Sequence, residues 1–142
     1  MRIAICDDLE SERQSLAKAL KEAVGDFSKE EFSSGDELLK SHLSKPYDLI
    51  FLDILMPDMS GLDTAAKLRE TDTETPVVFI SSSSEFGVQS YRVLAFDYLL
   101  KPVDTELLKA CMKRLLSGRK AKQYITIEYS GTETKVLLSN IQ

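Results

Sequence analysis

The sequence predicts an α/β fold in which a five-stranded, doubly wound parallel sheet is flanked by five helices. Three observations support this prediction. Four short runs of mainly apolar residues and one weaker, polar strand candidate recur along residues 1–117, and segments with apolar residues at helical spacing separate them. Several of these runs are apolar throughout, as expected for strands that are buried on both faces. Alternation of such strands with helices favours parallel pairing through crossover connections.

The first third of the chain contains two strands and one helix of this pattern. Residues 2–6 form an apolar run that ends at two aspartates, which is typical of a buried strand followed by a loop. Residues 10–24 carry leucine, alanine and valine at helical spacing, and Gly25 terminates this helix. A short second strand is expected at 29–32. Strand and helix therefore alternate from the start.

The middle of the chain continues the alternation with clear boundary signals. Ser34 and Glu37 lie three residues apart and predict a capping box for a second helix, which Pro46 terminates. The third strand is expected at 47–52, a strongly apolar run that is followed by Asp53. A loop with Pro57 and Gly61 comes next, because proline restricts φ and glycine permits unusual φ values.

The remaining elements complete five strands and five helices. Asp104 is expected to cap the last helix, which carries leucines, a cysteine and a methionine at helical spacing. The other predicted elements are a helix at 62–70, a strand at 76–80, a helix at 85–94 and a strand at 97–100. We expect this sheet to close with the flavodoxin-like strand order 2-1-3-4-5, which places a ligand site where the order reverses.

Composition and charge exclude several classes of protein. The 142 residues are 43% hydrophobic and 29% charged, values that argue against disorder, collagen and coiled coils. No apolar run is long enough for a membrane span, and two cysteines cannot build a disulfide framework or a zinc site. Residues 1–117 carry a net charge of −7 and residues 118–142 one of +2, so the main body is not expected to bind nucleic acid directly.

Polar residues follow four of the predicted strands, and these residues carry the predicted chemistry. Asp7 and Asp8 follow the first strand, Asp53 the third, Ser81 the fourth and Lys101 the fifth. The carboxyl ends of parallel strands meet at one edge of a sheet, so these side chains should converge. Two carboxylates about 4 Å apart repel by roughly 4 kcal/mol at an effective dielectric constant near 20. A hard divalent cation with oxygen ligands, such as Mg²⁺, would offset this repulsion.

A carboxylate in such a site can act as a nucleophile toward phosphorus and form an aspartyl phosphate. Phosphoryl transfer requires positioning and neutralisation of the phosphoryl oxygens more than it requires covalent chemistry. A cation bound at Asp8 and the ammonium of Lys101 would neutralise charge, and Ser81 would donate a hydrogen bond. The residues at these strand ends are therefore suited to phosphoryl transfer onto a carboxylate.

Three segments resemble the receiver domain of two-component response regulators. They are Ile-Ala-Ile-Cys-Asp-Asp around Asp8, Asp-Ile-Leu-Met-Pro-Asp-Met-Ser-Gly from Asp53, and Phe-Asp-Tyr-Leu-Leu-Lys-Pro up to Pro102. The resemblance covers residues 1–117. It implies that Asp53 accepts a phosphoryl group from a sensor histidine kinase, and that the domain is a switch protein rather than an enzyme acting on an outside substrate.

The resemblance also implies roles for the residues around Asp53. Asp8 would bind Mg²⁺ directly and Asp7 through water, while Asp53 and the carbonyl of Leu55 would complete the protein ligands. Lys101 would form an ion pair with the phosphoryl group. Its peptide bond to Pro102 would be cis, since X–Pro bonds are the common cis sites.

A switch is implied at two further positions. Ser81 would be the hydroxyl that is drawn toward the phosphoryl group, and Tyr98 the aromatic side chain that swings inward in response. Phosphorylation would then change a surface formed by the fourth helix, the fifth strand and the fifth helix, through which a homodimer could form. A cytoplasmic protein is expected.

The C-terminal residues predict a different structure. Residues 118–122 have the composition of a polar linker, and alternation with a Ser130-Gly131 turn predicts a β-hairpin beyond them. The segment resembles the start of a truncated, β-rich output domain of the LytTR type. We therefore expect a receiver domain at 1–117, a linker and the start of an output domain at 118–142, and DNA binding only through the missing output domain.

Two alternative functions were considered besides the receiver domain. A phosphatase of the haloacid-dehalogenase type also uses aspartate, lysine and Mg²⁺, but it carries a second aspartate two residues after the nucleophile, where this chain has Leu55. A receiver-like interaction module that works without phosphorylation is the other alternative. His42 is expected at the surface of the second helix, and Cys6 and Cys111 as buried small apolar residues.

Overall fold

The computed structural model describes residues 1–124, 129–130 and 133–134. The chain divides into two compact units, Met1–Leu108 and Lys109–Gln142. The first unit contains the whole five-stranded sheet. Its strands are β1 (Arg2–Cys6), β2 (Ser28–Phe32), β3 (Leu49–Asp53), β4 (Val77–Ser81) and β5 (Asp97–Leu100). The helices are α1 (Glu10–Val24), α2 (Gly35–Ser44), α3 (Gly61–Arg69), α4 (Gly87–Arg92) and α5 (Thr105–Tyr124).

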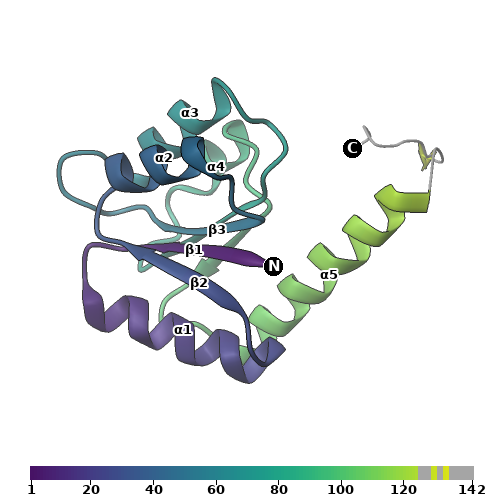
Figure 1. Ribbon diagram of the computed structural model, residues 1–142, viewed down its shortest axis with the longest axis horizontal. Helices are drawn as coiled ribbons and strands as arrows, with labels where there is room; N and C mark the ends of the chain where they lie inside the picture. The colour runs from purple at the N-terminus through teal and green to yellow at the C-terminus, as the bar shows by residue number, and fades with distance from the viewer. Residues whose placement is uncertain (125–128, 131–132, 135–142) are drawn as a thin grey trace. The chain divides into compact units, whose positions relative to one another are not determined.

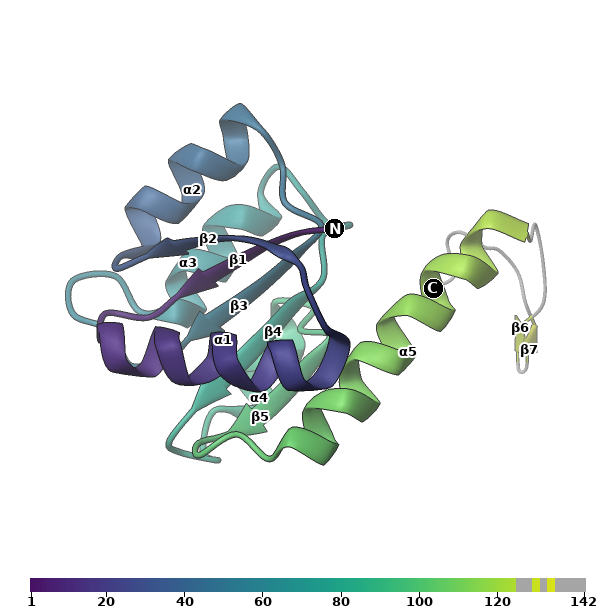
Figure 2. The ribbon, with the colours of Figure 1, turned by 60° about the horizontal axis from the view of Figure 1, so that its bottom comes forward.

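The sheet has the predicted topology. Its strand order is β2-β1-β3-β4-β5, and each neighbouring pair is parallel. Helix α1 lies on one face, and α2 and α3 lie on the other (Figure 1). The prediction of a doubly wound, flavodoxin-like sheet is therefore confirmed. With this order, β1 and β3 are central neighbours, and the loops after them leave the sheet side by side at its carboxyl edge (Figure 2).

Burial follows strand position. Every residue of β3 and β4 is buried, whereas three of the five residues of β2 are exposed. Central strands have a helix-covered face on each side, but β2 is an edge strand with a polar Ser-Lys-Glu-Glu sequence. Its charged side chains protect the open edge against pairing with another chain. This edge position explains why the second strand was the weakest of the five predicted runs.

Helix starts follow the predicted capping residues. The Ser34 hydroxyl accepts a hydrogen bond from the Glu37 amide at 3.3 Å, and the Asp104 carboxylate accepts one from the Glu106 amide at 2.8 Å. The reciprocal half of the capping box differs from the prediction, because the Glu37 carboxylate accepts from the Ser33 amide instead. Each cap satisfies amides that have no partner within the helix.

The last helix extends further than predicted. Residues 118–122, expected to be a linker, belong to α5, which runs from Thr105 to Tyr124. Arginine, lysine and alanine in this stretch are strong helix formers, and the single Gly118 costs only about 1 kcal/mol relative to alanine. The domain boundary predicted at 117 falls inside this helix and stays a prediction.

The predicted hairpin is represented by a short antiparallel ladder between β6 (Tyr129–Ser130) and β7 (Glu133–Thr134). The rest of the hairpin prediction, at 125–128, 131–132 and 135–142, lies outside the described residues. Among the residues that the structure describes, none of the helices combines the length and apolarity that crossing a bilayer requires.

The prediction for His42 was wrong. Its side chain is buried, with only 4% of the residue exposed. Its Nε2 atom lies 2.8 Å from the carboxylate of Asp72, and its Nδ1 atom accepts a hydrogen bond from the Tyr47 amide at 3.1 Å. The histidine therefore joins α2 to the loop after α3 and to the start of the segment leading into β3, at the amino edge of the sheet.

Candidate functional site

A cluster of three carboxylates occupies the carboxyl edge of the sheet. Asp7 and Asp8 follow β1, and Asp53 is the last residue of β3. One carboxylate oxygen of each lies within 4.8 Å of those of the other two. Asp7 and Asp53 are buried, and Asp8 is half-buried. The convergence expected from the parallel strand ends is thus observed, and an all-oxygen donor set of this kind suits Mg²⁺.

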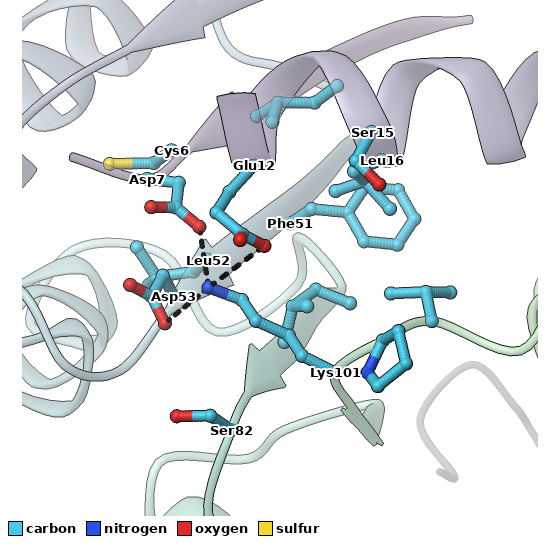
Figure 3. Close-up of a pocket in the computed structure, with 14 residues that line it drawn as sticks. Cys6, Asp7, Glu12, Ser15, Leu16, Phe51, Leu52, Asp53, Ser82 and Lys101 are labelled. Atoms are coloured by element: carbon cyan, nitrogen blue, oxygen red, sulfur yellow. Dashed lines mark hydrogen bonds and ion pairs between the residues drawn. The ribbon is translucent and has the colours of Figure 1, made fainter. Parts of the chain in front are cut away.

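Lys101 supplies the positive charge of the site. Its Nζ atom donates a hydrogen bond to Asp7 Oδ2 at 2.9 Å and lies 3.5 Å from Asp53 Oδ1 and 3.6 Å from Glu12 Oε1 (Figure 3). The peptide bond between Lys101 and Pro102 is cis, as expected. Lys101 follows β5 directly, so strand β5 determines where the ammonium group lies.

Ionisation of these groups reflects burial as well as charge. Burial, followed by the negative charge of Asp7, raises the pKa of Asp53 from 3.8 to about 6, and the attraction of Lys101 opposes this rise only in part. Burial alone would lower the pKa of Lys101. Its hydrogen bond to Asp7 and the charges of Asp53, Asp7 and Glu12 outweigh burial and raise that pKa. Lys101 therefore stays a protonated ammonium group. Asp53, by contrast, has few contacts that stabilise its ionised form.

The loop after Asp53 is held close beneath the cluster. Asp58 has a φ of 65° directly after Pro57, which is typical of a type II turn. The Gly61 amide donates a hydrogen bond to the Ile54 carbonyl at 2.8 Å. A Cβ atom at Gly61 would lie 2.0 Å from the backbone oxygen of Asp53, so only glycine fits there. Pro57 and Gly61 thus shape the loop, whereas the Leu55 side chain is exposed and its carbonyl stays a predicted ligand.

Ser81 and Tyr98 both contact the loop after β4. Ser81 is fully buried, and its hydroxyl accepts a hydrogen bond from the Ser83 amide at 3.1 Å. The Tyr98 hydroxyl donates to the Ser83 carbonyl, and its ring lies 6.4 Å from that of Phe79, measured between centroids. Both side chains therefore bond to Ser83, although the sequence analysis assigned no role to that residue. Tyr98 is already half-buried in this structure.

A cavity of about 350 Å³ opens beside the cluster. Its lining includes Asp7, Asp53 and Lys101 (Figure 3). Ser82, which the family resemblance places beside the phosphoryl site, and Glu12, for which no site role was predicted, line it as well. Ser82 lines the cavity and Ser81 does not, because neighbouring residues of an extended chain point to opposite sides. Glu12 lies in the first turn of α1, and no local pattern marks it as a site residue, because its partner Lys101 belongs to a distant segment of the chain.

Cys6 lies immediately before the carboxylate cluster, and its thiol is expected to be unreactive. Burial raises the pKa of its thiol to about 12, and the charges of Asp7 and Asp53 add to this effect. Its sulfur contacts the Ser34 carbonyl at 3.4 Å and the Met56 sulfur at 3.8 Å. The expectation that Cys6 is buried is confirmed, and its raised thiol pKa disfavours the thiolate form that acts as a nucleophile.

Comparison with known proteins identifies the family that shares this arrangement of residues. Residues 3–113 match the model of the response regulator receiver domain. The chain is 32% identical over 133 residues to the sensory transduction protein LytR of Staphylococcus haemolyticus, covering 92% of this chain and 52% of LytR. It is 35% identical over 115 residues to the positive alginate biosynthesis regulatory protein of Pseudomonas aeruginosa, covering 80% of this chain and 46% of that protein. These relatives agree with the subfamily expected from the sequence.

A solved structure shows the same fold. The response regulatory domain of protein mrkE from Klebsiella pneumoniae superposes with a TM-score of 0.74 at 26% identity, covering 84% of this chain and 98% of that one. The chain spans about half the length of the curated relatives it matches. Matching of residues 3–113, together with the shared fold, shows that this chain belongs to the response regulator receiver domain family of two-component systems.

Proposed function

We propose that Asp53 accepts a phosphoryl group from a phosphorylated histidine of a sensor kinase, in a reaction that depends on Mg²⁺. The observation that carries this proposal is the position of the Asp53 carboxylate. It lies buried at a strand end, within 4.8 Å of two further carboxylates, and its oxygen is 3.5 Å from the ammonium of Lys101. A ligand can reach this buried carboxylate through the cavity, and few hydrogen-bond donors of the protein contact it.

The chemistry follows from these positions. An Asp53 oxygen forms a bond to phosphorus while the P–N bond of the phosphohistidine breaks, and the electron pair of that bond leaves with the imidazole nitrogen. Lys101 would donate a hydrogen bond to one phosphoryl oxygen and neutralise part of its charge. Asp8, Asp7, Asp53 and the Leu55 carbonyl would hold Mg²⁺, which supplies charge neutralisation at the remaining phosphoryl oxygens.

The same residues can drive a switch. Ser81 would exchange its contact with the Ser83 amide for one with a phosphoryl oxygen, and this exchange would release one of the hydrogen bonds that hold Ser83. Tyr98 would then follow the Ser83 carbonyl. The surface of α4, β5 and α5 would change with the loop, affecting homodimer formation and a LytTR-type output domain that binds DNA. A histidine kinase and DNA as partners place this function in the cytoplasm.

Intact mass spectrometry tests the proposal directly. The protein is incubated with phosphoramidate and Mg²⁺, and the parent is compared with Asp53→Asn. We expect the parent to gain one phosphoryl group, and the variant and a chelator-treated parent to gain none. Asp58→Asn is the matched control, because Asp58 is exposed on the following loop and asparagine tolerates its left-handed φ. An adduct on both the parent and Asp53→Asn, or on neither, would contradict the proposal.

A further inference from the structure

Glu12 approaches the site without belonging to the carboxylate cluster. It lies in the first turn of α1, lines the same cavity as Asp53, and its Oε1 atom lies 3.6 Å from Lys101 Nζ. Its side chain is 39% exposed, compared with 6% for Asp53. Glu12 is therefore a solvent-accessible carboxylate at the mouth of the site, and it contacts the one group that the phosphoryl acceptor also needs.

The ammonium of Lys101 is shared among three carboxylates. It bonds closely to Asp7, at 2.9 Å, whereas the distances to Asp53 and Glu12 are nearly equal at 3.5 and 3.6 Å. Figure 3 draws the last two ion pairs on opposite sides of the Nζ atom. Movement of the ammonium toward one of these carboxylates therefore lengthens its distance to the other.

A simpler role for Glu12 would be to stabilise the helix. Acidic residues in a first turn interact favourably with the helix dipole, and α1 has two of them, Glu10 and Glu12. Only Glu12 reaches Lys101, because the Glu10 carboxylate instead accepts a hydrogen bond from Gln14 at 3.2 Å. Both residues can stabilise the helix, but only Glu12 can affect the site. A comparison of Glu12 with Glu10 therefore distinguishes the two roles.

We propose that Glu12 is a positioning residue that competes with the phosphoryl group on Asp53 for the Lys101 ammonium. This inference rests on the proposed function of Asp53. For Lys101 to contact a phosphoryl oxygen, its ammonium must give up part of its contact with Glu12. Glu12 therefore slows phosphoryl uptake and weakens binding of phosphoryl-like anions.

The size of the effect follows from exposure. A partly exposed ion pair is weak, so removing the Glu12 charge should accelerate phosphorylation about two- to fivefold, which corresponds to about 0.4–1 kcal/mol. Raising the ionic strength should reduce this gain, because salt screens exposed charges.

The test compares Glu12→Gln with Glu10→Gln, which makes the same charge change in the same helical turn. Phosphorylation by phosphoramidate at fixed Mg²⁺ is followed by intact mass, and the dissociation constant for beryllofluoride is measured in parallel. We expect Glu12→Gln to react two- to fivefold faster and to bind beryllofluoride correspondingly more tightly, with Glu10→Gln equal to the parent. Glu12→Asp keeps the charge but shortens the side chain, and it should fall between the parent and Glu12→Gln.

The outcomes separate this inference from the proposed function. Equal rates for Glu12→Gln and Glu10→Gln, or a slower Glu12→Gln, would overturn the competition with Lys101 while leaving Asp53 as the acceptor. Glu12→Asp that behaves like the parent would also overturn it, because the charge alone would then be responsible. A parent protein that takes up no phosphoryl group would overturn the proposed function and this inference together. A gain in rate cannot arise from loss of folding.

Discussion

The two edges of the sheet use the same residue type in opposite ways. At the carboxyl edge, the Asp53 carboxylate has one ion pair, with Lys101 at 3.5 Å, and like charges nearby. At the amino edge, the Asp72 carboxylate accepts four hydrogen bonds: from the Glu74 and Thr75 amides, the Thr75 hydroxyl and His42. The first carboxylate is left open to a ligand, and the second is fully occupied by the protein.

The ionisation of the two carboxylates differs accordingly. Burial and the charge of Asp7 raise the pKa of Asp53 to about 6. Burial alone would also raise the pKa of Asp72, but the hydrogen bonds from Thr75, His42 and nearby amides outweigh it and hold this pKa well below its ordinary value. The comparison indicates that hydrogen-bond donors, more than burial, decide whether a carboxylate at an edge of the sheet stabilises the fold or remains available for chemistry.

The amino edge is also reinforced by Arg69. Its guanidinium donates hydrogen bonds to the backbone carbonyls of Val93, Leu94, Asp72 and Thr75, at 2.9–3.1 Å. One side chain thus joins the end of α3 to the loops before β4 and β5. At the carboxyl edge, Arg13 donates to a single backbone carbonyl, that of Asp7 at 2.8 Å, and to the Glu31 carboxylate at 3.0 Å. Lys101, Ser81 and close packing also hold the loops of this edge.

A substitution that disturbs the close packing at the carboxyl edge should cause the largest loss of stability. Gly61→Ala places a Cβ atom 2.0 Å from the Asp53 oxygen and 2.8 Å from the Ile54 Cα atom. Both are backbone atoms that cannot move aside easily, so we expect a loss of about 3 kcal/mol in the free energy of unfolding. Urea unfolding measures this loss. Gly87→Ala is the matched control, because nothing lies within 4 Å of its Cβ position. Equal stabilities of the two variants would contradict the packing argument.

A substitution that removes the charge of Asp72 at the amino edge should cause a smaller loss of stability. Asp72→Asn replaces an acceptor of four hydrogen bonds with a group that donates toward the same partners, and should cost about 2 kcal/mol at pH 7. The pKa of Asp72 is lowered on folding from 3.8, so its contribution is complete above that value and is lost as pH falls through the lower, folded-state pKa. The difference between parent and variant in urea unfolding should therefore shrink below about pH 4. A parent and variant of equal stability at pH 7 would contradict the role of Asp72.

The same substitution at the carboxyl edge should have the opposite sign. Folding raises the pKa of Asp53 from 3.8 to about 6, so the ionised carboxylate destabilises the fold above that pH, and the penalty disappears as pH falls toward 3.8. With a chelator present, Asp53→Asn should gain about 1 kcal/mol in the free energy of unfolding at pH 7.5, because it removes a buried charge whose net effect, Lys101 included, is unfavourable. A loss of stability in this variant would remove the contrast between the two edges.

The elements and the site could be predicted because their signals are local. Apolar runs gave the strands of the sheet core, and Ser34 and Asp104 marked the starts of two helices. The carboxylate cluster followed from topology, since residues directly after parallel strands share an edge. By contrast, the end of α5 was placed too early, because the polar composition of 118–122 is shared by linkers and by exposed helices.

His42 and Glu12 show what local signals could not supply. His42 is buried because Asp72, 30 residues away, provides the acceptor that its imidazole needs. Glu12 reaches the site because the first turn of α1 lies beside Lys101, which follows β5 and lies 89 positions further along the chain. Neither partner can be identified from the pattern around the residue itself.

The sequence by itself determined the order of elements, the family and the set of acidic and basic side chains that meet at the carboxyl edge. These depend on periodicity and on positions next to strand ends, which are properties of short segments. Only the tertiary structure decided which carboxylate is saturated with donors and which remains open, and which residues compete for Lys101. Burial and hydrogen-bond partners come from distant segments of the chain, so they exist only once the chain has folded.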